Sequence, residues 1–308
     1  TRSDAIRETE YSATSVNGYL PSRTEKRTPY LRNVFEPSLE YQFGKDSLFS
    51  INYRNNVYRI DSRTSKDSTE NYISPKIIYW FNIRHGVSLE YGLTLGNFER
   101  SPDLIGHMGT GRYTYRFNPK TSLFGEYTQL WRDFDSPSVD YTIYRPSLGV
   151  EHAITPSLSA KVQGGYYWKD PDLGKTQGGP YFDILITQRG LRTTYVLSLT
   201  GGYTEDYFSS ENRGFTKYYR VLGRVNHQIA KKMNVGLFSS YEWGKIPEVV
   251  IGSEKEINRI WGIGGTASYQ LFNWLTLALE ASHRGNNSNF DAKDYGEYRG
   301  LLKITATF

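Results

Sequence analysis

The sequence contains no cysteine and only two methionines among its 308 residues. The lack of cysteine excludes disulfides and thiolate metal sites, and it suits an envelope protein that folds without them. A membrane-spanning helix needs about 18 consecutive apolar residues, and no stretch of the sequence comes near that length. The N-terminal segment TRSDAIRETEYS lacks the charged and then apolar pattern of a signal peptide. If the protein is exported, we therefore expect this chain to be its mature form or a fragment of it.

Charge of one sign is not concentrated anywhere in the chain. The 37 Lys and Arg residues are interspersed with 32 Asp and Glu residues, so the net charge of +5 gives no basic patch, and we expect no nucleic-acid partner. Tyrosine is abundant, with 26 residues, and hydrophobic residues make up only 38% of the chain. Tyrosine in place of much of the usual Leu, Ile and Val suits a wall that is one residue thick.

Strand–turn–strand units recur along the chain, for example FEPSLEYQFGKDSLFSINYRN from Phe35 and WGIGGTASYQLFNWLTLALEASHRG from Trp261. The period of about 35 to 42 residues is that of an array of hairpins. The predicted short turns are centred near Asp46, His85, Lys120, Pro156, Leu191, Lys231 and Asn273.

Longer polar segments, such as SRTSKDST after Asp61, alternate with these short turns. Short turns on one rim and longer loops on the other are typical of outer-membrane β-barrels, whose short-turn rim is periplasmic. We therefore predict an all-β, transmembrane, antiparallel up-and-down barrel of about 16 strands in a single domain, 1–308. Residues 1–7 are expected to be a flexible periplasmic segment, and the first strand to lie within 8–18.

Apolar and polar residues alternate within the predicted strands. In LTLALEASHR, Leu275, Leu277 and Leu279 share one face, and Glu280 and Arg284 share the other. A closed barrel in a membrane needs this pattern, with lipid outside and water inside. The basic residues predicted to line the pore are Arg54, Lys76, Arg112, Arg116, Arg132, Arg145, Lys161, Lys169, Arg220, Arg224, Arg284 and Lys303. The acidic ones are Glu40, Glu90, Glu126, Glu151, Glu242 and Glu280.

These charges have two interpretations: a pore with a basic surplus for anionic solutes, or cross-strand pairs that only solvate a wide wall. No inter-strand segment is long enough to suggest an inward-folded plug, so we expect an unplugged lumen that either charged side chains constrict or a periplasmic partner closes. Tyr58, Trp80, Tyr167 and Tyr218 also have inward parity, either to stack on sugar rings or to pack.

Tryptophan marks the expected membrane boundary. Trp131, Trp168, Trp243 and Trp261 have outward parity and lie about ten residues from the nearest short turn, a rise of about 25 Å along a tilted strand. Trp274, beside a short turn, is expected in the opposite girdle. The last strand ends at Phe308, and it resembles outer-membrane barrels generally, in which a terminal aromatic residue is recognised by the barrel-assembly machinery.

The segments YRFNPKTSLFGEYTQLW and EHAITPSLSAKVQGGYY resemble the β-barrel porin family found near exopolysaccharide gene clusters. The resemblance extends over most of the chain through its hairpin composition. It implies export of a polymer through the barrel.

Enzyme motifs are scarce. The five histidines have no metal-ligand spacing, and neither a nucleophile elbow nor a phosphate-binding loop occurs. We expect no enzyme activity, no cofactor and no metal, and keep His152 with a serine on a neighbouring strand only as a remote alternative.

The predicted function is an outer-membrane translocation pore for a secreted polysaccharide. The first alternative is a passive uptake porin for small anionic or sugar solutes, and the second a structural or adhesion barrel. The expected partners are outer-membrane lipids, the barrel-assembly machinery, a periplasmic export partner, and a sugar polymer or small solute. The expected location is the outer membrane of a Gram-negative-type bacterium.

Overall fold

The computed structural model describes residues 30–60, 67–99, 101–135, 138–208, 214–246 and 255–306. The predicted N-terminal segment 1–7, the first strand predicted within 8–18, and Phe308 lie outside these ranges.

Sixteen strands make up nearly all of the described chain. Their bounds are β1 Tyr30–Phe35, β2 Ser38–Gln42, β3 Leu48–Ile60, β4 Ser68–Trp80, β5 His85–Phe98, β6 Leu104–Asn118, β7 Thr121–Phe134, β8 Tyr141–Ala153, β9 Leu158–Pro171, β10 Gln177–Arg189, β11 Thr193–Asp206, β12 Gly214–Ala230, β13 Met233–Ile246, β14 Glu256–Phe272, β15 Leu275–Ser288 and β16 Tyr295–Ala306.

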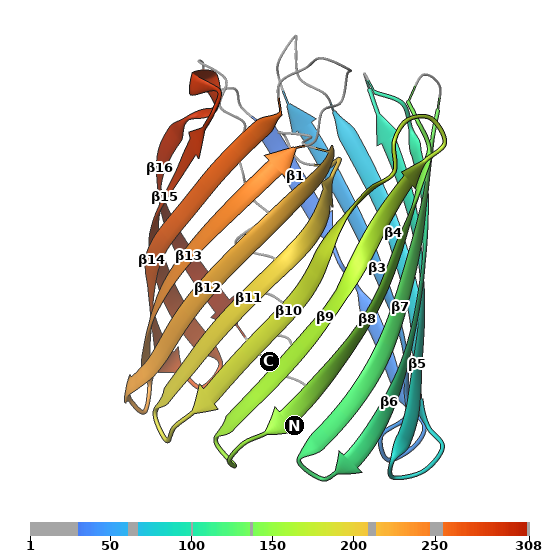
Figure 1. Cartoon of the computed structure of the whole chain (residues 1–308). Helices are drawn as coiled ribbons and strands as arrows, with labels where there is room; N and C mark the ends of the chain where they lie inside the picture. The colour runs from blue at the N-terminus through green and yellow to red at the C-terminus, as the bar shows by residue number, and fades with distance from the viewer. Residues whose placement is uncertain are drawn as a thin grey trace.

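The strands form one antiparallel sheet in which β3 to β16 each pair with their neighbours along the chain. Both β1 and β2 pair with β3, one after the other along its length. The sheet curls into a barrel of steeply tilted strands (Figure 1). The predicted all-β, up-and-down barrel of about sixteen strands is thus confirmed.

The connections at one rim are short, at residues 43–47, 81–84, 119–120, 154–157, 190–192, 231–232 and 273–274. Six of the seven predicted turn centres lie within these connections. The seventh, His85, adjoins one of them as the first residue of β5. Longer connections lie at the upper rim of Figure 1. By the asymmetry of outer-membrane barrels, the short-turn rim is periplasmic and the upper rim extracellular.

The only helix among the described residues is a single 3₁₀ turn, Asp291–Lys293. No helix in the described part of the chain is long and apolar enough to cross a membrane.

Gly202 reverses the alternation of β11. Before it, the odd-numbered side chains point outward, as shown by the exposure of Tyr195 and Leu197. Gly202 has a φ of 153°, a conformation that side-chain-bearing residues rarely adopt. After it, Tyr203 and Glu205 contact residues of β9 and β7, so they point inward. Without this glycine, strand periodicity would place both side chains in lipid.

Two adjacent glycines on β9 provide a test of wall packing. A Cβ atom at Gly165 would lie 2.2 Å from the carbonyl oxygen of Pro146 and 2.8 Å from the Cα of Ser147, both backbone atoms of β8. We expect Gly165→Ala to destabilise the barrel by about 1–3 kcal/mol, the usual cost of overpacking.

The matched control is Gly164→Ala, because a Cβ there would meet nothing within 4 Å. Unfolding of both variants, followed by the heat-dependent shift of the folded barrel in gel electrophoresis, compares them directly. Equal stability of the two variants would contradict the close approach of β8 and β9.

Candidate functional site

The inner face of the barrel is identified by contacts between strands that are not neighbours. Arg132 on β7 contacts Glu205 on β11, and Arg112 on β6 contacts Glu151 on β8. Such contacts cross the concave side of the sheet. The alternate residues of the same strands, such as Tyr113, Tyr127 and Leu148, are exposed on the convex side.

Most of the basic residues predicted to line the lumen form ion pairs with acidic residues on the inner face of the barrel. The pairs are Arg54–Glu70, Lys76–Glu90, Arg112–Glu126, Arg112–Glu151, Arg116–Asp46, Arg132–Glu205, Arg145–Glu126, Lys161–Asp183 and Arg220–Glu242. Glu90, Glu126, Glu151 and Glu242 are thus brought to basic partners. This arrangement matches the cross-strand pairing interpretation of the sequence.

The centre of the network is Glu126. Its carboxylate lies 4.0 Å from Arg112 and 3.7 Å from Arg145, and it accepts a hydrogen bond of 3.1 Å from the amide of Gln163. Arg112 also pairs with Glu151 at 2.6 Å. One carboxylate therefore links β6, β7, β8 and β9 across the inner wall.

Aromatic rings underlie the guanidinium groups of this wall. The Arg112 guanidinium carbon lies 3.6 Å from the centre of the Phe124 ring, and that of Arg116 lies 3.5 Å from the Trp80 ring. Arg145 covers Tyr181 at 4.5 Å. Stacking and ion pairing together hold these side chains against the wall, because each guanidinium is fixed both on its face and at its edge.

The remaining predicted residues are arranged differently. Lys169 lies 3.9 Å from the Tyr141 ring, and Arg224 lies 5.8 Å from the Phe238 ring. In the strand register, Arg284 faces Glu297, Lys303 faces Ala278, Glu280 faces Thr266, and Glu40 faces Ser50.

The inner face of β14 is uncharged from Gly262 to Gln270. It presents Gly262, Gly264, Thr266, Ser268 and Gln270, which share their face with Glu280, Ser282 and Arg284 of β15. A strip of hydroxyl groups and glycines therefore lies in the same lumen as the charge-paired wall.

The chain itself narrows one end of the lumen. The end of β11 and the two residues after it fold across the interior at the extracellular end. The hydroxyl of Tyr207 lies 2.5 Å from that of Tyr141 on β8, and the Phe208 ring stacks 5.1 Å from Phe98 on β5. A short segment can do this because Gly202 has already turned the chain inward.

An ion pair anchors this inward fold, which we call the mouth segment, residues Tyr203–Phe208. Glu205 contacts Arg132 at 2.7 Å and accepts a 2.5 Å hydrogen bond from Tyr141, and both side chains of the ion pair are only 12% exposed. Tyr203 packs 4.9 Å from Tyr167. Burial raises the pKa of Tyr207, so its hydroxyl stays protonated as a donor.

Sequence reasoning missed several of these partners for different reasons. Glu70 and Asp183 have the inward parity of their strands, so the alternation itself could have identified them. Glu205 has outward parity when counted along β11, but beyond Gly202 its contact with Arg132 places it inside. No pattern in the sequence around Phe208 indicates that its side chain contacts β5.

The predicted girdle tryptophans lie on the convex face. Trp131, Trp168, Trp261 and Trp274 are 38%, 42%, 38% and 48% exposed. Trp243 stacks on Tyr219 at 5.6 Å, and Tyr219 in turn stacks on Phe182 at 5.9 Å. Two aromatic levels are therefore present on the outer wall, as lipid interfaces favour.

No group of side chains in the described ranges could hold a metal ion. The described histidines bond to groups on adjacent strands instead. For example, His152 pairs with Thr121 at 2.9 Å and His107 with Tyr91 at 2.6 Å.

Comparison with family models and with curated proteins gives no match. Solved structures similar to this chain include the FrpB iron transporter from Neisseria meningitidis, with 8% identity and a TM-score of 0.59 over 91% of this chain and 57% of that one. The copper transporter OprC has 10% identity and a TM-score of 0.54, over 89% and 56%. The ferric citrate transporter FecA has 9% identity and a TM-score of 0.52, over 91% and 56%.

The chain spans just over half the length of these structures. At such low identity the likeness concerns the fold. A bilayer requires a β-protein to have an apolar outer face, aromatic girdles and backbone groups that are paired between strands, and this chain has these features together with a polar interior. This chain has the fold of an outer-membrane β-barrel and is located in a Gram-negative-type outer membrane.

Proposed function

We propose that the barrel is a translocation pore of the outer membrane and that its cargo is a secreted polysaccharide. The observation that carries this proposal is the compensated inner wall: the guanidinium groups of β6–β8 are paired with carboxylates and stacked on rings. Such a wall offers many weak hydrogen-bonding groups to a solute, and its paired charges exert little net electrostatic force on an ion in the lumen.

A sugar polymer suits this lumen better than a strongly charged solute. Its hydroxyls can exchange hydrogen bonds with the serine, threonine and glutamine side chains of β14 and with the paired charges facing them. Conduction requires attraction that is strong enough for entry and weak enough for release. The transporters similar in fold support a transport role in general.

The alternative is a passive uptake porin for small anionic or sugar solutes. The mouth segment favours it, because an inward fold at the extracellular end limits the size of what can pass. Lys169, held against the rings of Tyr141 and Phe215 just beneath the mouth, adds a positive charge at that point.

The two proposals are separated by single-channel conductance of the refolded protein in planar bilayers, with neutral oligosaccharides of increasing length and small anions added. We expect conductance with weak ion selectivity that falls progressively as longer oligosaccharides are added. Competition by small anions, without any effect of long oligosaccharides, would favour the uptake porin. Absence of conductance would contradict both proposals.

A further inference from the structure

The two ends of the sheet do not pair with each other. β1 and β2 bond to β3, and β16 bonds to β15, and within the described ranges neither edge has a second partner strand. All of β2 is exposed on both faces, and so is β16 from Gly300 to Ala306. Unpaired backbone N–H and C=O groups are not tolerated in the hydrocarbon of a bilayer, so both edges require a partner.

The direction of the edge strands shows which partner fits. β2 ends at the short-turn rim, at residues 43–47, and β15 leaves the same rim at residues 273–274, so β16 returns to it. The strands β1, β2 and β16 therefore all run from the extracellular to the periplasmic rim. Paired directly, the two edges would form a parallel pair in a sheet whose described pairs are antiparallel. A strand that runs upward between them is antiparallel to both.

The number of crossings leads to the same requirement. β1 and β2 pair with successive stretches of β3, so together they cross the wall once, and β3 to β16 cross it fourteen times. The described strands thus cross the wall an odd number of times, whereas barrels formed by a single bacterial chain have an even number of strands. One further strand makes the number even.

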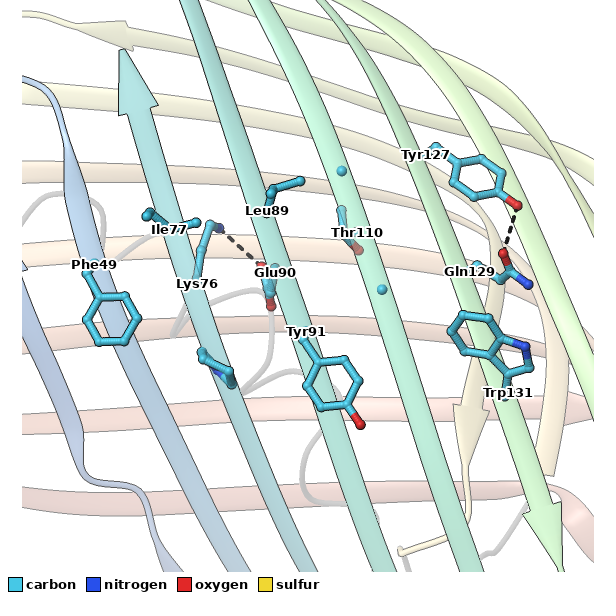
Figure 2. A pocket seen from close by; sticks show the side chains of 13 residues that line it. Phe49, Lys76, Ile77, Leu89, Glu90, Tyr91, Thr110, Tyr127, Gln129 and Trp131 are labelled. Carbon is cyan, nitrogen blue, oxygen red and sulfur yellow. Dashed lines mark hydrogen bonds and ion pairs between the residues drawn. The ribbon is translucent and has the colours of Figure 1, made fainter. Parts of the chain in front are cut away.

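Inward charges at the two edges lack partners. Within the wall, Lys76 pairs with Glu90 on the next strand at 3.3 Å (Figure 2). Lys303 on β16 and Glu40 on β2 also have inward parity, but they form no ion pair within the described residues. A strand inserted at the seam would give Lys303 a neighbour on its open side.

The segment that precedes β1 has the direction and length of this strand. Because β1 begins at the extracellular rim, a strand joined to it there must run upward. Residues 8–18, ETEYSATSVNG, contain no proline and match the about 9–11 residues of a tilted membrane-spanning β-strand. The next segment, PSRTEKRT, is polar and charged like SRTSKDST after Asp61, so it suits an extracellular loop.

The alternation of residues 8–18 fixes the orientation of such a strand. Glu8 and Glu10 share one face, and Tyr11 and Ala13 share the other. Only the orientation with the carboxylates inside keeps charge out of the lipid.

We propose that residues 8–18 form the strand that fills the seam between β16 and β1–β2, antiparallel to both, with Glu8 and Glu10 facing the lumen beside Lys303. The chain then closes its own barrel with an even number of strands. This inference is independent of the cargo of the pore.

Paired cysteines test the proposal directly, because the chain has no cysteine of its own. In the full chain, Ala13→Cys is combined in turn with Gly300→Cys, Leu302→Cys or Ile304→Cys, at outward positions of β16. A second series combines it with Leu39→Cys or Tyr41→Cys of β2. The folded variants are oxidised and then unfolded for electrophoresis.

We expect an intramolecular disulfide at one position of each series and its loss at the adjacent positions, because a disulfide needs Cα atoms about 5.5–6 Å apart. The matched control is Ala13→Cys with Leu237→Cys, an exposed outward position on β13, which should not cross-link. Absence of a cross-link in both series would overturn the proposal. So would a disulfide between Leu302→Cys and Leu39→Cys in one chain, or dimers linked through Leu302→Cys, since β16 would then pair with β2 or with a second copy.

Proline substitutions provide a second measurement. Thr14→Pro removes a backbone N–H in the middle of the proposed strand, so it should lower the temperature of the heat-dependent gel shift. Thr24→Pro, in the polar segment PSRTEKRT, should leave that temperature unchanged. Equal temperatures for the two variants would contradict a strand at residues 8–18.

Discussion

Glu205→Ala should open the extracellular mouth and raise the single-channel conductance. The substitution leaves the Arg132 guanidinium buried without its carboxylate, and it removes the acceptor of the Tyr141 hydroxyl. Breaking a buried ion pair by removing one partner costs about 3–5 kcal/mol. The mouth segment then loses its anchor, so we expect lower thermal stability together with larger and noisier current steps.

Two further variants separate the role of the anchor from that of the rings. Phe208→Ala removes the contact with Phe98 but keeps the ion pair, so it should widen the mouth with a smaller loss of stability. Phe272→Ala removes an aromatic ring of the outer wall near the short-turn rim and should leave the conductance unchanged. Unaltered current in both Glu205→Ala and Phe208→Ala would mean that the mouth segment does not limit flow.

Glu126→Gln is expected to convert a weakly selective lumen into an anion-selective one. Its carboxylate compensates both Arg112 and Arg145, and the amide of glutamine retains the shape without the charge. One uncompensated unit charge about 4 Å from an ion in a watery lumen is worth about 1 kcal/mol. The ratio of chloride to potassium permeability, obtained from the reversal potential in a salt gradient, should therefore rise by at least about fivefold, because the charge attracts one ion and repels the other.

The double variant Arg112→Gln with Glu126→Gln is the control, because it removes one charge of each sign. Its reversal potential should return to that of the unaltered protein. If Glu126→Gln leaves the ion selectivity unchanged, ions must pass far from the wall of β6–β8.

The residues on the outer and inner faces could be predicted because side chains alternate between the two faces of a strand. The bilayer accepts only the apolar face, so the polar face must point into the barrel. Leu275 to Arg284 illustrates this, since its alternation fixes which face meets lipid. The turns could be predicted because short polar connections interrupt these alternating runs. Pairing partners on neighbouring strands, such as Lys76 and Glu90, follow once the turns are located.

The tertiary structure alone decided the mouth of the barrel. One glycine conformation, at Gly202, reverses the faces of β11, and strand periodicity carries no information about a single φ angle. The contacts of Glu205 with Arg132 and of Phe208 with Phe98 join strands four and six positions apart. Such contacts depend on how the curved sheet brings distant strands together. Local alternation determined the barrel and its two faces, whereas the curvature of the wall determined which side chains meet across its interior.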